Sequence, residues 1–157
     1  MSKTDITDTK IVELLMREGR MPAAEIARNI GGITERIVRY RIDKMIEGGL
    51  ISISAIVHPQ KIGYYVAADV LLEVETGRIQ GVAESLVDLD CISYVACSIG
   101  ETDVSVQVRA KDTDEVYRIV TEVIGRIPGV RKTTTSIVPV VLKDVYQWRI
   151  PSSAVKE

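Results

Sequence analysis

Apolar residues recur every three or four positions in three separate stretches of the first fifty residues. This spacing predicts three short helices, because residues three and four positions apart lie on the same face of a helix. The first helix is expected over residues 5–18, followed by Gly19. A second is expected to open at Pro22 and run to Ile30 before the pair Gly31-Gly32. A third is expected to follow Thr34 and to end at Gly48-Gly49.

The helix ends carry residues with recognisable capping roles. Asp5 or Thr7 can cap the first helix, Pro22 is tolerated in a first helical turn, and Thr34 is a good N-cap for the third helix. The apolar stripes of the three helices predict one small core. Its expected members are Ile6, Ile11, Leu14, Leu15, Ile26, Ala27, Ile30, Ile37, Ile42, Met45 and Ile46.

Beyond residue 50 the apolar spacing shortens from helical to alternating. Residues 51–57 carry a weak strand pattern, and Pro59 to Gly63 read as a connection. The remainder predicts the element order β-α-β-β-α-β, which is the ferredoxin-like arrangement. Asp112 to Asp114 cap its second helix, and Pro128-Gly129 turn the chain into its last strand. The expected elements are strand 64–75, helix 78–88, strand 92–99, turn 100–102, strand 103–110, helix 113–126 and strand 131–142.

The fold class predicted from these patterns is α+β, with an N-terminal helix-turn-helix (winged-helix-like) domain and a C-terminal ferredoxin-like βαββαβ domain. We expect residues 1–50 to form the first domain, 51–63 a linker strand and connector, and 64–157 the second domain. Ala67 and Leu71 suggest that the sheet is apolar on the face without helices as well. Such a face usually finds a partner subunit, so self-association is expected, although residues 1–62 are an alternative cover.

Composition limits the function classes. Residues 1–62 hold ten Lys/Arg against eight Asp/Glu, and the remainder holds ten against fourteen, so charge alone does not indicate nucleic-acid binding. No apolar run approaches the roughly 20 residues that span a bilayer, and no signal-peptide pattern opens the chain. A cytoplasmic protein with no membrane contact is therefore expected. Cys91 and Cys97 suit two buried thiols better than a bridge, and His58 is the single histidine, so neither a metal nor a cofactor is expected.

The third predicted helix concentrates cationic and aromatic residues on its polar side, namely Arg36, Arg39, Tyr40 and Lys44. A helix that follows a tight turn and carries such residues in its first turns is suited to the major groove of double-stranded DNA, where arginine pairs with guanine. Thr34 can cap the helix and also donate to a phosphate. The alternative for each arginine is a solvated face or a salt bridge to Glu35 or Asp43.

Six motifs in order along the chain resemble the Lrp/AsnC, or feast/famine, transcription regulators over essentially the whole length. They are TDITDTKIVELLMREGR, EIARNIGGITERIVRYRIDKMIEGGLI, IVHPQKIGYYVAADV, GETD at 100–103, IPGVRKTTTSIV and LKDV at 142–145. The resemblance implies a DNA-binding helix-turn-helix and a C-terminal domain that forms homodimers, tetramers or octamers. It also implies a small molecule, commonly an amino acid, bound between subunits.

The resemblance adds further candidate residues. Arg41 matches an arginine that recurs in the family, either as a phosphate contact or as a structural bridge to an acid such as Glu13 or Glu25. The implied effector site comprises Gly100, Glu101, Thr102, Asp103, Thr133, Thr134 and Thr135. Gly100 would let the backbone approach a ligand, and Asp103 would pair with an α-amino group. The alternative is a plain hairpin turn and a β-branched strand.

The chain departs from the family pattern twice. The turn Gly31-Gly32-Ile33 is one residue longer than the usual turn, which would tilt the third helix, and Thr102 stands where a tyrosine is frequent.

Two other function classes fit the residue pattern less well. An enzyme related to tetrapyrrole decarboxylases shares the two-part architecture, but a single histidine and two cysteines without a base equip the chain poorly for it. A metabolite-binding or assembly protein with a vestigial helix-turn-helix would be expected to lose the basic residues of the third helix. Four of them are retained here. Tail residues Tyr146 and Trp148 are expected to form an extra edge strand that docks on the same subunit or on a neighbouring one.

Overall fold

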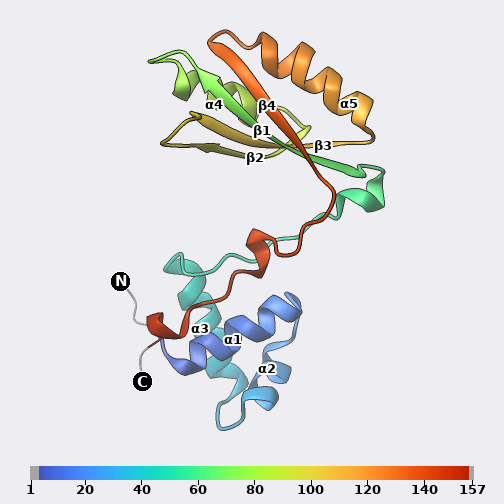
Figure 1. Cartoon of the computed structure of the whole chain (residues 1–157). Coiled ribbons are helices and arrows are strands. Elements are labelled where there is room, and N and C mark those ends of the chain that lie inside the picture. The colour runs from blue at the N-terminus through green and yellow to red at the C-terminus, as the bar shows by residue number, and fades with distance from the viewer. Residues whose placement is uncertain (1–3, 156–157) are drawn as a thin grey trace. The chain divides into compact units, whose positions relative to one another are not determined.

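The computed structural model describes residues 4–155, which divide into two compact units (Figure 1). One unit comprises the described residues up to Ile56 together with the chain from Lys143 onward. The other runs from Val57 to Leu142. This division differs from the expected second domain, 64–157, because the C-terminal tail groups with the helical unit. Ile150 in this tail packs against the core of the N-terminal helices.

Three α-helices form the helical unit, as the apolar spacing predicts. They are α1 (Ile6–Arg17), α2 (Ala23–Ile30) and α3 (Glu35–Glu47). Asp5 caps α1 in a reciprocal capping box with Asp8, since each carboxylate accepts from the other residue's backbone N–H. Pro22 precedes α2 as its cap rather than lying in its first turn. The buried residues of this unit are Ile11, Val12, Ile26, Ala27, Val38 and Met45.

The prediction that Ile37 and Ile46 belong to the buried face of α3 is wrong. Each is 42% exposed, while Val38 is fully buried. Val38, Ile42 and Met45 follow the spacing i, i+4, i+7 and already fill the stripe that faces α1 and α2. Apolar character alone does not distinguish these three from their neighbours. Ile6 is likewise 51% exposed.

The expected strand over residues 51–57 does not form within the chain, and residues 51–58 have no regular structure. Ile53, Ile56 and Val57 are exposed. A strand requires a neighbour for its backbone hydrogen bonds, and this segment finds none among the described residues of the same chain. A short 3₁₀ turn, Pro59–Ile62, then leads into the second unit, where Gly63 adopts the left-handed conformation with φ of 91°.

The second unit is a four-stranded antiparallel sheet with the order β2-β3-β1-β4. Its elements confirm the predicted βαββαβ sequence with slightly shorter bounds. They are β1 (Val66–Val74), α4 (Ile79–Val87), β2 (Ile92–Cys97), β3 (Val104–Ala110), α5 (Thr113–Arg118) and β4 (Val130–Val138). Asp112 caps α5 as expected. A π-helical turn, Ile119–Val123, and a 3₁₀ turn, Ile124–Arg126, extend α5 over the rest of the predicted helix.

Both helices of this unit lie on one face of the sheet, which is where its core forms (Figure 1). Alternate β1 residues from Ala68 to Val74 point into this core, as do alternate β3 residues from Val104 to Ala110. They pack against both helices on that same face. Val82 and Leu86 come from α4, and Val116, Val120 and Ile124 come from the α5 segment.

The opposite face of the sheet is more polar than predicted. Leu71 is 40% exposed there, but Asp69 and Glu73 alternate with it along β1. Asp69 accepts from the side chain of Gln107 on β3, whose amide oxygen in turn accepts from Arg109. The expectation of a second apolar face rests on Ala67 and Leu71, whereas Asp69 between them and Glu73 after them make this face partly charged.

The tail residues Tyr146 and Trp148 do not form an edge strand on the sheet of their own chain. Val145–Gln147 is a 3₁₀ turn with Asp144 as its cap, and a further 3₁₀ turn spans Ser152–Ala154. Both aromatic side chains are largely exposed. The expectation of two buried thiols is also wrong, because Cys97 is exposed and Cys91 is only half-buried.

Candidate nucleic-acid interface and effector loop

The N-terminus of α3 is positioned by a glycine turn and a threonine cap. Gly31 and Gly32 have φ of 73° and 72°, a conformation that side-chain-bearing residues rarely adopt. Thr34 then accepts a hydrogen bond from the backbone N–H of Ile37 through its hydroxyl oxygen, 3.3 Å away. The predicted capping role of Thr34 is confirmed. The cap leaves other N–H groups of the first turn without helical partners, which favours an anion at this end.

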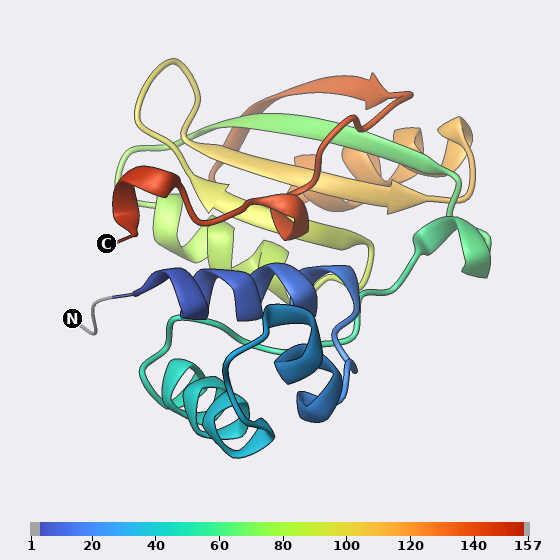
Figure 2. The same ribbon diagram turned by 90° about the horizontal axis from the view of Figure 1, so that it is seen from below.

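The outward face of α3 carries the cations that the sequence predicts. Figure 2 shows α3 at the outside of the three-helix group, with α1 and α2 to one side of it. Arg36, Arg39, Tyr40 and Lys44 are all exposed. Arg39 forms an ion pair with Glu35 one turn earlier, as one of the alternatives anticipated. The Lys44 ammonium lies 6.0 Å from the centre of the Tyr40 ring, within reach of a cation–π interaction.

Arg41 is instead bonded to the start of α1. Its Nη1 donates to Asp5 at 2.8 Å and to Asp8 at 2.7 Å. The expectation of a structural bridge is confirmed, but the named partners, Glu13 and Glu25, are wrong. These hydrogen bonds raise the pKa of Arg41, the one that it donates to Asp8 most strongly. Desolvation alone would raise the pKa of Asp5. The Asp8 amide and Arg41 outweigh it and hold that pKa below its ordinary value.

A surface groove of about 400 Å³ runs beside this bridge, between α3 and the start of α1. Asp5, Asp8 and Arg41 of the bridge line it, together with Ile37, Tyr40 and Lys44 of α3. Met45, Gly48 and Leu50 also contribute to the lining. The groove therefore meets the exposed face of α3 along a border of apolar and cationic side chains.

The predicted effector loop is held at the end of the sheet by Asp103. The backbone N–H of Asp103 donates to the carbonyl of Leu72, and its carbonyl accepts from Ser98. The Asp103 carboxylate accepts from the backbone N–H of Val74 at 2.7 Å. Gly100 within the loop has φ of 153°, which also requires glycine. One oxygen of the Asp103 carboxylate is thus already engaged with the protein.

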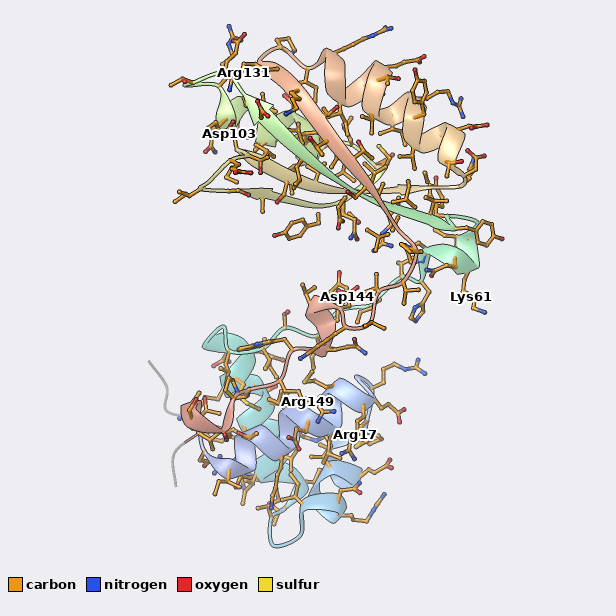
Figure 3. The ribbon with its side chains drawn as sticks, in the orientation of Figure 1. Arg17, Lys61, Asp103, Arg131, Asp144 and Arg149 are labelled. Carbon is orange, nitrogen blue, oxygen red and sulfur yellow. The ribbon has the colours of Figure 1, made fainter. Side chains whose placement is uncertain are left out.

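The three threonines of β4 do not share one face. Thr133 and Thr135 pair with Leu72 and Val70, whose side chains point into the core, whereas Thr134 pairs with Leu71 on the open face. Asp103 bonds to Leu72 from one side of β1, and Thr133 pairs with Leu72 from the other side. Their backbones are therefore separated by two strand spacings of about 5 Å each. Figure 3 shows Asp103 and Arg131 at this same end of the sheet.

The structure thus brings the α3 residues together on one surface and the effector residues to one end of the sheet. Glu101 and Gly100 are exposed, while Thr102 is half-buried. Two features were missed from the sequence. The exposure of Ile37 has no local signal, whereas Arg131 lies two residues before the predicted threonine run. Within residues 4–155, no helix is both long and apolar enough to cross a bilayer.

Two family models match the chain. Residues 5–46 match the AsnC-type helix-turn-helix domain, and residues 67–147 match the Lrp/AsnC ligand binding domain. An uncharacterized HTH-type transcriptional regulator of Pyrococcus furiosus is 34% identical over 92% of this chain and 95% of its own. The HTH-type transcriptional regulator FL11 of Pyrococcus abyssi is 37% identical over 85% of this chain and 88% of its own.

Solved structures share the fold. Escherichia coli AsnC superposes with a TM-score of 0.82 at 23% identity, covering 90% of this chain and 97% of that one. A Neisseria meningitidis transcriptional regulator in complex with L-methionine also gives 0.82, at 20% identity, covering 89% and 92%. The matches extend over both units, and the curated relatives are regulators rather than enzymes. This chain accordingly belongs to the Lrp/AsnC family of DNA-binding, HTH-type transcriptional regulators with a ligand-binding domain.

Proposed function

We propose that this regulator recognises specific operator sequences by placing the first turns of α3 in the major groove. In this proposal Arg36 and Arg39 contact base edges, while Thr34 and Lys44 contact phosphates. The observation that carries the proposal is that the arginines of α3 fall into two groups, one exposed and one bonded to α1. Arg36, Arg39 and Tyr40 are exposed on one side, whereas Arg41 is tied to α1.

Arg41 has a different role in this scheme. Because its Nη1 already donates to Asp5 and Asp8, Arg41 fixes the rotation of α3 about its axis. A phosphate contact through its remaining N–H groups stays a prediction. The surface of α3 does not support the alternative of a vestigial helix-turn-helix, because the basic residues of this helix are retained and none of them is buried.

The test is selection of bound duplexes from a random DNA pool, followed by fluorescence anisotropy on the recovered sequence. We expect two related half-sites about 10 bp or a multiple apart, with affinity that falls as salt rises. Arg36→Ala and Arg39→Ala should each weaken binding by about 1–3 kcal/mol. Lys61→Ala, an exposed cation of the second unit (Figure 3), serves as the matched control. Recovery of no preferred sequence would contradict the proposal.

We further propose that two copies associate through the open face of the sheet. Leu71 on β1 and Tyr94 on β2 are 40% and 52% exposed on this face, with β3 between their strands, and both are large apolar side chains. Their burial against a second copy would present two α3 helices to one DNA duplex. Sedimentation should show at least twice the chain mass of 17.3 kDa, and Leu71→Asp should reduce it to that mass. A wild-type protein that sediments as a single chain would refute this.

The end of the sheet near Asp103 is proposed to bind a small effector such as an amino acid, between subunits. Asp103 and Glu101 can accept from an α-amino group, Arg131 can pair with an α-carboxylate, and the hydroxyls of Thr133 to Thr135 can complete the site. Calorimetric titration with a panel of amino acids, including L-methionine, tests this. The regulator is proposed to act in the cytoplasm, where it has access to DNA.

A further inference from the structure

Ile37 occupies an unusual position for an apolar side chain. It lies in the first turn of α3, where its backbone N–H donates to the Thr34 cap, and its side chain remains 42% exposed. Val38, the next residue, supplies the buried contact of this turn. The core of the helical unit is therefore complete without full burial of Ile37.

The surroundings of Ile37 combine apolar and cationic groups. Ile37 and Tyr40 lie three residues apart, in the lining of the groove described above, and Lys44 follows one turn later. Lys44 stands over the Tyr40 ring, and Arg36 precedes Ile37 on the exposed face. The apolar side chain of Ile37 is thus bordered by positive charges. This arrangement suits a polyanionic ligand that presents one apolar group, because the cations can pair with its anions while Ile37 contacts the apolar group.

In the major groove, the edge of each base pair presents hydrogen-bond donors and acceptors, and the thymine C5 methyl is the apolar group among them. We propose that Ile37 contacts the methyl group of one thymine in each operator half-site and so determines specificity at that position. This inference rests on the proposed major-groove binding by α3. Ile37 would add selection for thymine, which the arginines cannot provide because guanidinium groups select guanine.

The charge around Ile37 favours DNA over a protein partner as the occupant. Arg36 and Lys44 flank the contact point, and Arg41 pairs with both acidic groups of the groove, Asp5 and Asp8, and so offsets one of their two negative charges. The helix N-terminus also favours an anion at this end. Phosphates on either side of a thymine would satisfy these cations while the methyl group meets Ile37.

The experiment replaces single thymines by uracil in the selected operator, which removes the methyl group and leaves all hydrogen-bonding groups in place. With wild-type protein, one thymine per half-site should be sensitive, with affinity about fourfold weaker for each methyl removed. Ile37→Ala should bind the thymine and uracil duplexes equally, and should lose the preference for thymine at that position in a repeated selection.

Ile46→Ala is the matched control. Ile46 is also an isoleucine of α3 with 42% exposure, but it lies at the C-terminal end of the helix. It should keep the full discrimination between thymine and uracil. Thermal unfolding of both variants reports any loss of folding, and the uracil scan of the wild-type protein needs no variant.

The inference is overturned if no thymine is sensitive to uracil replacement, or if Ile37→Ala retains the discrimination. It is also overturned if Ile37→Ala weakens binding to both duplexes by the same factor, which would indicate a structural role. These outcomes differ from failure of the proposed function, in which wild-type protein selects no sequence at all.

Discussion

The Nη1 atom of Arg41 lies 2.7 Å from Oδ1 of Asp8, so the helix proposed to read DNA is joined to the first turn of α1. Asp8 also completes the capping box with Asp5, whose carboxylate accepts from the same guanidinium. The cap of one helix and the rotation of another are therefore set by a single three-residue cluster. Asp8 is only 15% exposed and Arg41 29%, so solvent screens this bridge less than an ordinary surface pair.

Replacing Arg41 by methionine should destabilise the helical unit by about 1–2 kcal/mol, since two carboxylates lose a charged donor. Chemical denaturation followed by circular dichroism measures the change. Arg28→Met, at an exposed site on α2, should have little effect. Equal stability of the two variants would show that the bridge contributes nothing. Operator and non-specific DNA affinities should fall together, because the whole of α3 would be less firmly placed.

The cluster also predicts a pH dependence. The pKa of Asp5 is lowered in the folded protein, so its contribution to stability is present above its unfolded pKa of about 4 and is lost as the pH falls through the folded value. Asp5→Asn keeps an N-cap side chain but removes the charge. Thermal melts between pH 6 and about 3 should show a smaller acid-induced loss for this variant than for wild type. Parallel curves would argue against the linkage.

In the proposed complex, Glu35 competes with DNA for Arg39. Because the two side chains form an exposed ion pair, Arg39 must exchange Glu35 for a base or phosphate on binding. Glu35→Gln removes both this competition and a negative charge near the phosphates, so operator affinity should rise by up to about 1 kcal/mol. Anisotropy titrations measure it, with Glu47→Gln at the far end of α3 as the control. An unchanged or weaker affinity would place Arg39 away from the DNA.

Asp103 can be tested for two roles separately. Its carboxylate accepts from the Val74 N–H, a bond that an asparagine oxygen can still accept. Asp103→Asn should therefore keep the loop in place but abolish amino-acid binding if the charge pairs with the α-amino group. Asp103→Ala should lose both the binding and about 1 kcal/mol or more of stability. Ligand binding that persists in Asp103→Asn would leave this carboxylate a purely structural role.

The two cysteines should differ in reactivity. Burial raises the pKa of Cys91 and lowers its thiolate fraction, whereas Cys97 is exposed. Titration with a thiol reagent near pH 8 should show one fast and one slow phase, separated by about tenfold or more. The fast phase should disappear in Cys97→Ser. Its persistence in that variant would mean that Cys91 is the accessible thiol.

Local chemistry accounts for what could be predicted from the sequence. Helix ends at Asp5 and Thr34 depend on hydrogen bonds across three residues, and the turn at Gly31-Gly32 depends on backbone conformation at two positions. The alternation of buried and exposed side chains along β1 likewise depends only on residues that are adjacent in the chain. These features, and the βαββαβ order built from them, lie within reach of a pattern analysis because every partner is nearby in the chain.

Tertiary packing decided the rest. Arg41 reaches acids 33 and 36 positions away, and Asp103 reaches a backbone group 29 positions away, so no spacing rule identifies these partners. Ile37 and Ile46 resemble Ile42 in sequence, but the position of α1 and α2 determines which side of α3 is covered. The tail follows the same logic, since Ile150 joins a core whose other members precede it by about a hundred residues.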